Sequence, residues 1–115
     1  MKKIALVAYQ GELMCFSHVM LYALDYAEKG YEVAVIIEGA ATKLITDLAK
    51  PETPFAAQYR QLREQGLIAC ICKACATKMG TYDEAREQGL LMGSDMHGHP
   101  SLEHYTRLGY EVMTF

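Results

Sequence analysis

The chain has 115 residues, of which 51% are hydrophobic and 22% are charged. This length predicts a single domain, residues 1–115, with a core large enough to fold without disulfide bonds. The net charge is −3 and no block of basic residues occurs, which argues against a nucleic acid or an anionic membrane as a partner.

The first residues, MKKIALVAYQGELMCF, place two lysines before a short apolar run, as a signal peptide does. Gln10, Gly11 and Glu12 interrupt the run and no small-residue cleavage pattern follows, so a first β-strand fits it better. No stretch approaches the ~18 apolar residues of a membrane span. We therefore expect a cytoplasmic protein, in which clustered cysteines are catalytic, redox-active or metal-binding in preference to structural disulfides.

Short apolar runs alternate with helical patterns along the whole chain. The expected strands cover residues 2–8, 31–37, 67–72, 90–92 and 110–115. The expected helices cover residues 12–29, 40–49, 55–65, 74–79, 81–88 and 100–108. Strands that alternate with helices predict an α/β fold, a three-layer α/β/α sandwich with a mainly parallel five-stranded sheet.

Individual signals set the boundaries of these elements. Apolar residues recur every three or four positions in the first helix, which Gly30 ends. The segment KPETP separates the second and third helices, because proline is excluded from a helix interior. Thr81 with Glu84 forms a capping box at the start of one helix, and Pro100 suits the first turn of the last.

Three of the four cysteines lie in residues 70–75, within the segment GLIACICKACATKMG. Ligands of a parallel sheet gather beyond the carboxyl ends of its strands, where Cys72 ends the third strand. Unpaired amides of the following helix and the positive charge of Lys73 favour a Cys72 thiolate, which predicts a nucleophile with a lowered pKa. Cys75 completes a C-x-x-C one helical turn away, and Cys15 lies in the first helix near the same edge.

Other chemistries fit the same residues. A zinc site needs four ligands, which Cys70, Cys72, Cys75 and His97 would supply, with His99 as a further candidate. Alternatively, Cys72 and Cys75 form a dithiol redox pair. Cys70, one step deeper in the strand, fits a small core residue, and His97 and His99 fit turn-forming roles or proton transfer to a thiol.

The chain resembles the DsrE/DsrF-like family, which includes the TusD-like sulfur-relay proteins. The resemblance rests on the opening KKIALVAYQG, the apolar third strand running into CKAC, Gly80, and the final LGYEVMTF. Family members often carry a cysteine, sometimes as C-G-x-C, at this strand-to-helix turn. Cys72 and Cys75 match the first and second cysteine, with Lys73 in place of the glycine.

The resemblance implies that the chain assembles into a homo-trimer or homo-hexamer. It also implies that the protein is a sulfur carrier with sulfurtransferase-like chemistry. Cys72 would accept sulfane sulfur from a donor protein as a persulfide and pass it to an acceptor protein, with Cys75 as the second reactive thiol. Lys73, His97, His99 and Cys15 are supporting candidates, and no cofactor is expected. The alternatives are a non-catalytic oligomer that binds zinc or a small ligand, and a dithiol redox protein.

Overall fold

The structure, a computed structural model, describes residues 2–115. Its strands are β1 (Lys3–Ala8), β2 (Glu32–Ile37), β3 (Ile68–Cys72), β4 (Met92–Gly93) and β5 (Tyr110–Thr114). Its helices are α1 (Leu13–Glu28), the 3₁₀ helix η1 (Gly39–Leu44), α2 (Ile45–Leu48), α3 (Ala56–Glu64), α4 (Lys73–Met79), α5 (Tyr82–Glu87) and α6 (Leu102–Arg107). Among the described residues, no helix is both long and apolar enough to cross a membrane.

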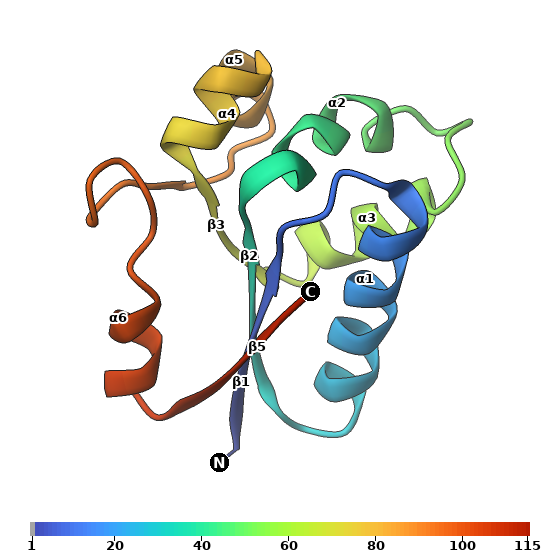
Figure 1. Cartoon of the computed structure of the whole chain (residues 1–115). Helices are drawn as coiled ribbons and strands as arrows, with labels where there is room; N and C mark the ends of the chain where they lie inside the picture. Colours follow the sequence, from blue (N-terminus) through green and yellow to red (C-terminus); the bar gives the residue numbers. More distant parts are fainter. Residues whose placement is uncertain (1) are drawn as a thin grey trace.

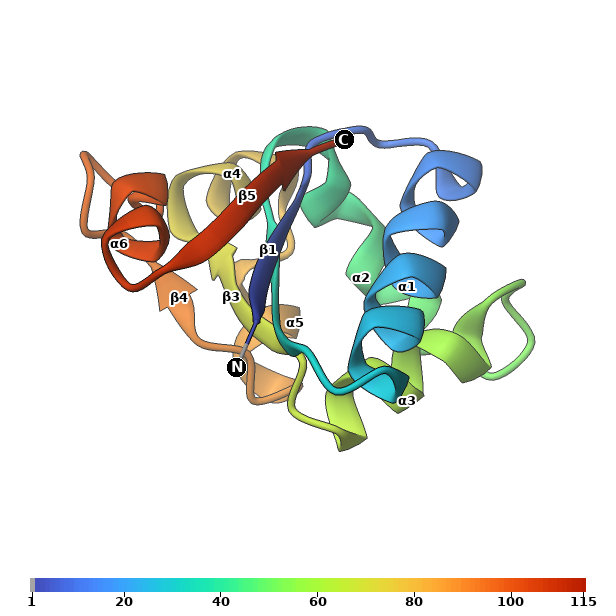
Figure 2. The same ribbon diagram turned by 90° about the horizontal axis from the view of Figure 1, so that it is seen from below.

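The five strands form one sheet in the order β4-β3-β2-β1-β5, and every pair of neighbours is parallel. Helices α1 and α3 lie on one side of this sheet and α6 on the other, while α4 and α5 lie beyond the end of β3 (Figures 1 and 2). The expected α/β fold is confirmed, and the sheet is entirely parallel.

Each face of the sheet has its own apolar core. On the α1 side, residues such as Leu6 and Val35 pack with Phe16, Met20 and Tyr59. The core on the opposite face is smaller. It packs Leu102 and Tyr105 of α6 against the strand residues Ala5, Val7, Ala34, Ile36 and Cys70. Because the central strands are buried on both faces, their sequences are apolar throughout instead of alternating.

Three expected elements differ from the structure. The helix expected over residues 40–49 is split into η1 and the four-residue α2, and residue 39 before it has a φ of 52° that only glycine adopts freely. The fourth strand is Met92–Gly93 instead of residues 90–92. Pro100 does not lie in the first turn of α6, which begins two residues later at Leu102.

The predicted capping box at Thr81 is wrong, although a helix does begin at Tyr82. The Thr81 side chain makes no capping hydrogen bond to α5. Its hydroxyl, which is buried, instead donates to the carbonyl of Thr42 at 2.9 Å. A buried hydroxyl must find a partner, and here the partner is a long-range one that joins the α4–α5 turn to η1.

Candidate functional site

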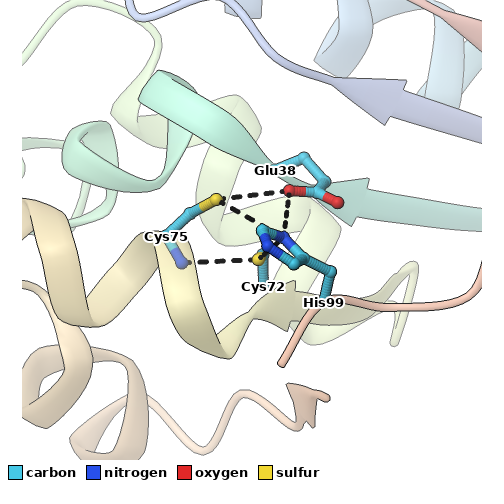
Figure 3. Close-up of side chains that lie close together, drawn as sticks. All are labelled: Glu38, Cys72, Cys75 and His99. Carbon is cyan, nitrogen blue, oxygen red and sulfur yellow. Dashed lines mark hydrogen bonds and ion pairs between the residues drawn. The ribbon is translucent and has the colours of Figure 1, made fainter. Parts of the chain in front are cut away.

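Four side chains from three separate segments meet at the carboxyl-end edge of the sheet (Figure 3). Glu38 follows β2, Cys72 is the last residue of β3, Cys75 lies in the first turn of α4, and His99 lies in the loop after β4. Their S, N and O atoms all lie within 4.8 Å of one another. Parallel strands bring these segments together because their carboxyl ends share one edge.

Cys72 is both the end of β3 and the N-cap of α4. Its backbone is extended, and its Sγ accepts a hydrogen bond from the amide of Cys75 at 3.4 Å. The Sγ also lies 3.1 Å from Nδ1 of His99. Its exposed fraction is 0%, so the thiol is enclosed by its own helix, the His99 loop and Glu38.

The pKa of Cys72 is shifted in the direction opposite to the one expected from the sequence. Burial, above all, raises the pKa of this thiol to about 12, and the neighbouring Cys75 and Glu38 also act in the raising direction. The amide of Cys75 acts in the lowering direction but is outweighed. The expectation of a lowered pKa was wrong because it counted the helix amides and left out desolvation and the carboxylate.

A tight turn positions His99. Met96 and His99 exchange two backbone hydrogen bonds of 2.8 and 2.9 Å, and the two residues between them, His97 and Gly98, have φ values of 52° and 86°. Two consecutive positive φ values are the mark of a type I′ turn. The Gly98 carbonyl accepts from the amide of Ala74 at 2.9 Å, which fixes this turn to the start of α4 and holds His99 over Cys72.

Glu38 is the residue of this cluster that was not among the sequence candidates. It is 6% exposed. Its Oε1 accepts from the amide of Gly39 at 3.2 Å and from Cys75 Sγ at 3.3 Å, and lies 3.6 Å from His99 Nδ1. The sequence contains a signal that could have identified Glu38, because this residue directly follows an apolar strand at the edge where ligands gather.

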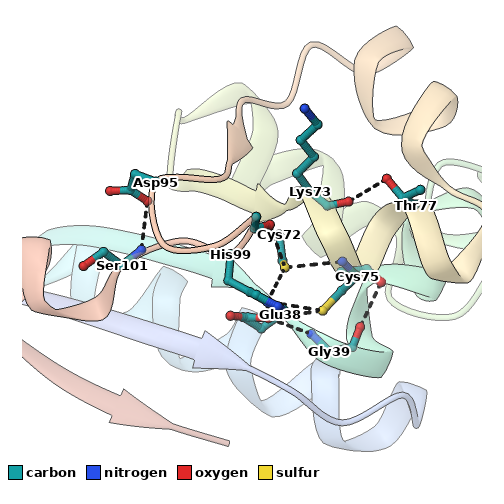
Figure 4. Close-up of polar contacts among 11 residues, drawn as sticks. Glu38, Gly39, Cys72, Lys73, Cys75, Thr77, Asp95, His99 and Ser101 are labelled. Carbon is teal, nitrogen blue, oxygen red and sulfur yellow. Dashed lines mark hydrogen bonds and ion pairs between the residues drawn. The ribbon is translucent and has the colours of Figure 1, made fainter.

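The other sequence candidates lie elsewhere. Cys70 is buried on the α6 side, and its Sγ lies 3.7 Å from the hydroxyl of Tyr105. His97 is exposed. Lys73 is exposed and its side chain extends away from the thiols (Figure 4). Cys15 lines a separate shallow pocket with Tyr22 and Phe115.

Glu38 is the one carboxylate of the cluster. Within residues 2–115, His99 is the one ion-pair partner of Glu38. The nearby hydroxyl of Tyr9 responds to this field: burial, then Glu38, Cys72 and Cys75, raise its pKa. This arrangement can therefore hold a proton that the two thiols, the imidazole and the carboxylate share. It can equally hold a cation in the same place.

A family model described as the DsrE/DsrF-like family matches residues 4–115. The general role of that family is sulfur relay with partner proteins. The match spans every described strand and helix apart from the first residue of β1, so it covers all four residues of the cluster.

Two uncharacterized proteins are similar to this chain in sequence. The chain is 29% identical over 104 residues to the uncharacterized protein MJ0733 of Methanocaldococcus jannaschii, covering 90% of this chain and 83% of that protein. It is 44% identical over 41 residues to an uncharacterized protein of Archaeoglobus fulgidus, covering 36% of this chain and 67% of the other.

A solved structure has a similar architecture. It is the conserved protein of unknown function BT1422 from Bacteroides thetaiotaomicron, with a TM-score of 0.76 over 99% of this chain and 95% of that chain. The sequence identity is 17%, so the similarity establishes the fold alone.

Proposed function

Because this chain belongs to the DsrE/DsrF-like family, we propose that it is a sulfur carrier that holds sulfane sulfur as a persulfide on Cys72. The observation that carries the proposal is the contact between Cys72 Sγ and His99 Nδ1 at 3.1 Å. It supplies a proton acceptor beside a thiol that is protonated at neutral pH.

The loading step exchanges one S–S bond for another. The Cys72 proton passes to Nδ1 of His99, and Cys72 Sγ attacks the outer sulfur of a donor persulfide. The new Cys72 S–S bond forms as the donor S–S bond breaks, and the donor's cysteine leaves as a thiolate that takes the proton from His99. The products are the Cys72 persulfide and the donor thiol, and the exchange involves no net oxidation or reduction.

Stabilisation of the loaded form comes from the start of α4. The amide of Cys75, 3.4 Å from Sγ, donates to the developing negative charge, as helix N-termini do for anions. Cys72 has no exposed surface, so a donor approaches past the partly exposed Cys75 and His99, and these side chains must shift to admit it.

Cys75 offers a second outcome for the loaded sulfur. Its Sγ lies within 4.8 Å of the Cys72 Sγ. Attack by Cys75 on the inner sulfur of the persulfide would form a Cys72–Cys75 disulfide and release hydrogen sulfide, and an external dithiol would then restore both thiols. Transfer to an acceptor cysteine is the alternative and leaves both thiols reduced.

Intact-mass spectrometry of the reduced, chelator-treated chain, after incubation with a low-molecular-weight persulfide, tests the proposal. We expect a gain of one sulfur atom that a reductant removes. Cys72→Ser should abolish the gain, Cys75→Ser should retain it, and Cys15→Ser, a change outside the cluster, is the matched control. Unchanged loading of Cys72→Ser would remove Cys72 from the mechanism.

A further inference from the structure

Glu38, Cys72, Cys75 and His99 direct four ligand atoms toward a common point (Figure 3). The separations are 3.1 Å for Cys72 Sγ to His99 Nδ1, 3.3 Å for Cys75 Sγ to Glu38 Oε1, 3.6 Å for His99 Nδ1 to Glu38 Oε1, and 3.9 Å for Cys75 Sγ to His99 Nδ1.

These distances are close to four of the six edges of a small tetrahedron. Tetrahedral Zn²⁺ holds sulfur at about 2.3 Å and nitrogen or carboxylate oxygen at about 2.0–2.2 Å, which places its ligand atoms roughly 3.4–3.8 Å apart. The four separations bracket that range, and the two remaining pairs, Cys72 Sγ with Cys75 Sγ and with the Glu38 carboxylate, lie within 4.8 Å, so shifts of up to about an ångström would bring all four atoms to bonding distance. The donor set of two sulfurs, one nitrogen and one oxygen is one that Zn²⁺ accepts.

Burial gives an independent argument for a cation. The Glu38 side chain is 8% exposed, and the groups that contact its carboxylate are its neighbouring amide, one thiol and an imidazole. Burying a carboxylate is costly unless a positive charge or several hydrogen bonds compensate it. A lysine or arginine ion pair to Glu38 does not occur in the described chain, and a divalent cation would supply the missing charge.

We propose that Glu38, Cys72, Cys75 and His99 form a four-ligand Zn²⁺ site. Zn²⁺ would displace the two thiol protons, so both cysteines would bind as thiolates. Four protein ligands close the coordination shell, which is typical of a metal that is held and not one that binds substrate. The site differs from the set expected from sequence, because Glu38 and His99 replace Cys70 and His97.

Zn²⁺ at this site would affect sulfur loading. This effect rests on the proposed function, whereas the metal site itself does not. The Cys72 electron pair that would attack a donor persulfide is the pair that would bind Zn²⁺. Metal and sulfane sulfur therefore compete for one thiolate, and Zn²⁺ would hold the carrier in an unloaded form.

Metal binding is tested on the full chain, reduced and freed of metal with a chelator. Native mass spectrometry during titration with zinc chloride should show one Zn²⁺ per chain, lost on denaturation. Co²⁺ in place of Zn²⁺ should give the intense visible bands of a tetrahedral ion and thiolate-to-metal charge transfer. Absence of stoichiometric Zn²⁺, or a weak octahedral Co²⁺ spectrum without charge transfer, would overturn the site without any variant being needed.

Variants then identify the ligands. Glu38→Gln and His99→Gln should each weaken Zn²⁺ binding at least ~10-fold, since a closed site loses one of its four bonds. Cys70→Ser and His97→Gln are the matched controls, and both should bind Zn²⁺ as the unmodified chain does. The reverse pattern would restore the ligand set expected from sequence and contradict this one.

Competition is measured separately. The Zn²⁺-loaded chain should gain no sulfur from the persulfide, and a chelator should restore the gain. Equal loading with and without Zn²⁺ would refute the competition. A chain that never gains sulfur but binds Zn²⁺ through these four residues would refute the carrier function and leave the metal site intact.

Discussion

Sγ of Cys72 lies 3.1 Å from Nδ1 of His99, although the two residues are 27 positions apart in sequence. One residue ends a central strand and the other follows a type I′ turn anchored on the helix after that strand. This contact pairs a buried thiol of raised pKa with an imidazole nitrogen placed to accept its proton.

Replacement of His99 should slow the chemistry of Cys72 without unfolding the chain. We expect His99→Gln to reduce the rate of Cys72 alkylation at pH 7 by ~100-fold, because a positioned base contributes about 10²–10⁴-fold. Peptide mass mapping after timed iodoacetamide treatment of chelator-treated protein gives the rate. His97→Gln changes an exposed histidine of the same turn and should react as the unmodified chain does. Equal rates for both variants would show that His99 does not act as the base.

The pH profile of the His99→Gln variant reports the pKa of Cys72 itself. The ordinary pKa of a cysteine thiol is 9.0, and burial raises the pKa of Cys72 to about 12. The reactive thiolate fraction should therefore rise about tenfold for each pH unit from pH 7 to 10 and show no plateau. Glu38 and Cys75, which face Cys72, both act to raise its pKa, and the Tyr9 hydroxyl lies in the same field. A plateau near pH 9 would mean that Cys72 behaves as an exposed thiol.

Gly98 tests whether the turn is what positions His99. Its φ of 86° is unfavourable for alanine, so Gly98→Ala should lower the free energy of unfolding by about 1–2 kcal/mol and also displace His99. Gly109→Ala is the matched control: its φ is 92°, and an added Cβ would meet nothing within 4 Å. Thermal unfolding should show similar losses in both variants, while Cys72 alkylation should slow in Gly98→Ala alone. Slowing in both variants would indicate a global effect and contradict the positioning role.

Sequence patterns were sufficient for the fold class, because buried parallel strands and glycine-ended helices are local signals. The apolar run ending at Cys72 located the strand end, and Gly80 located the end of α4, where φ is 78°. Strand order is not a local property, and hydrophobic periodicity does not determine it. The Thr81 hydroxyl shows the same limit, since its partner Thr42 is 39 residues away.

Only part of the candidate site could be predicted from the sequence, for the same reason. Cys72 could be placed at the site because ligands gather beyond the carboxyl ends of parallel strands. Cys75 could be placed beside it because the two cysteines are one helical turn apart. Which histidine reaches them depends on the direction of a turn: His97 has a positive φ and is exposed, whereas His99 lies against the thiols. Glu38 needed the three-dimensional packing of β2 beside β3, and burial of the site reversed the expected pKa shift of Cys72.

Sulfur loading on Cys72 is the central claim, and the mass of the chain measures it directly. Reduced, metal-free protein is incubated with a persulfide donor and its intact mass is compared with that of Cys72→Ser, Cys75→Ser and Cys15→Ser. A reductant-labile gain of one sulfur atom in the unmodified chain and in Cys15→Ser, absent from Cys72→Ser, is the predicted result. Loading that persists in Cys72→Ser, or no loading in either the unmodified chain or Cys75→Ser, would contradict a carrier that works through Cys72.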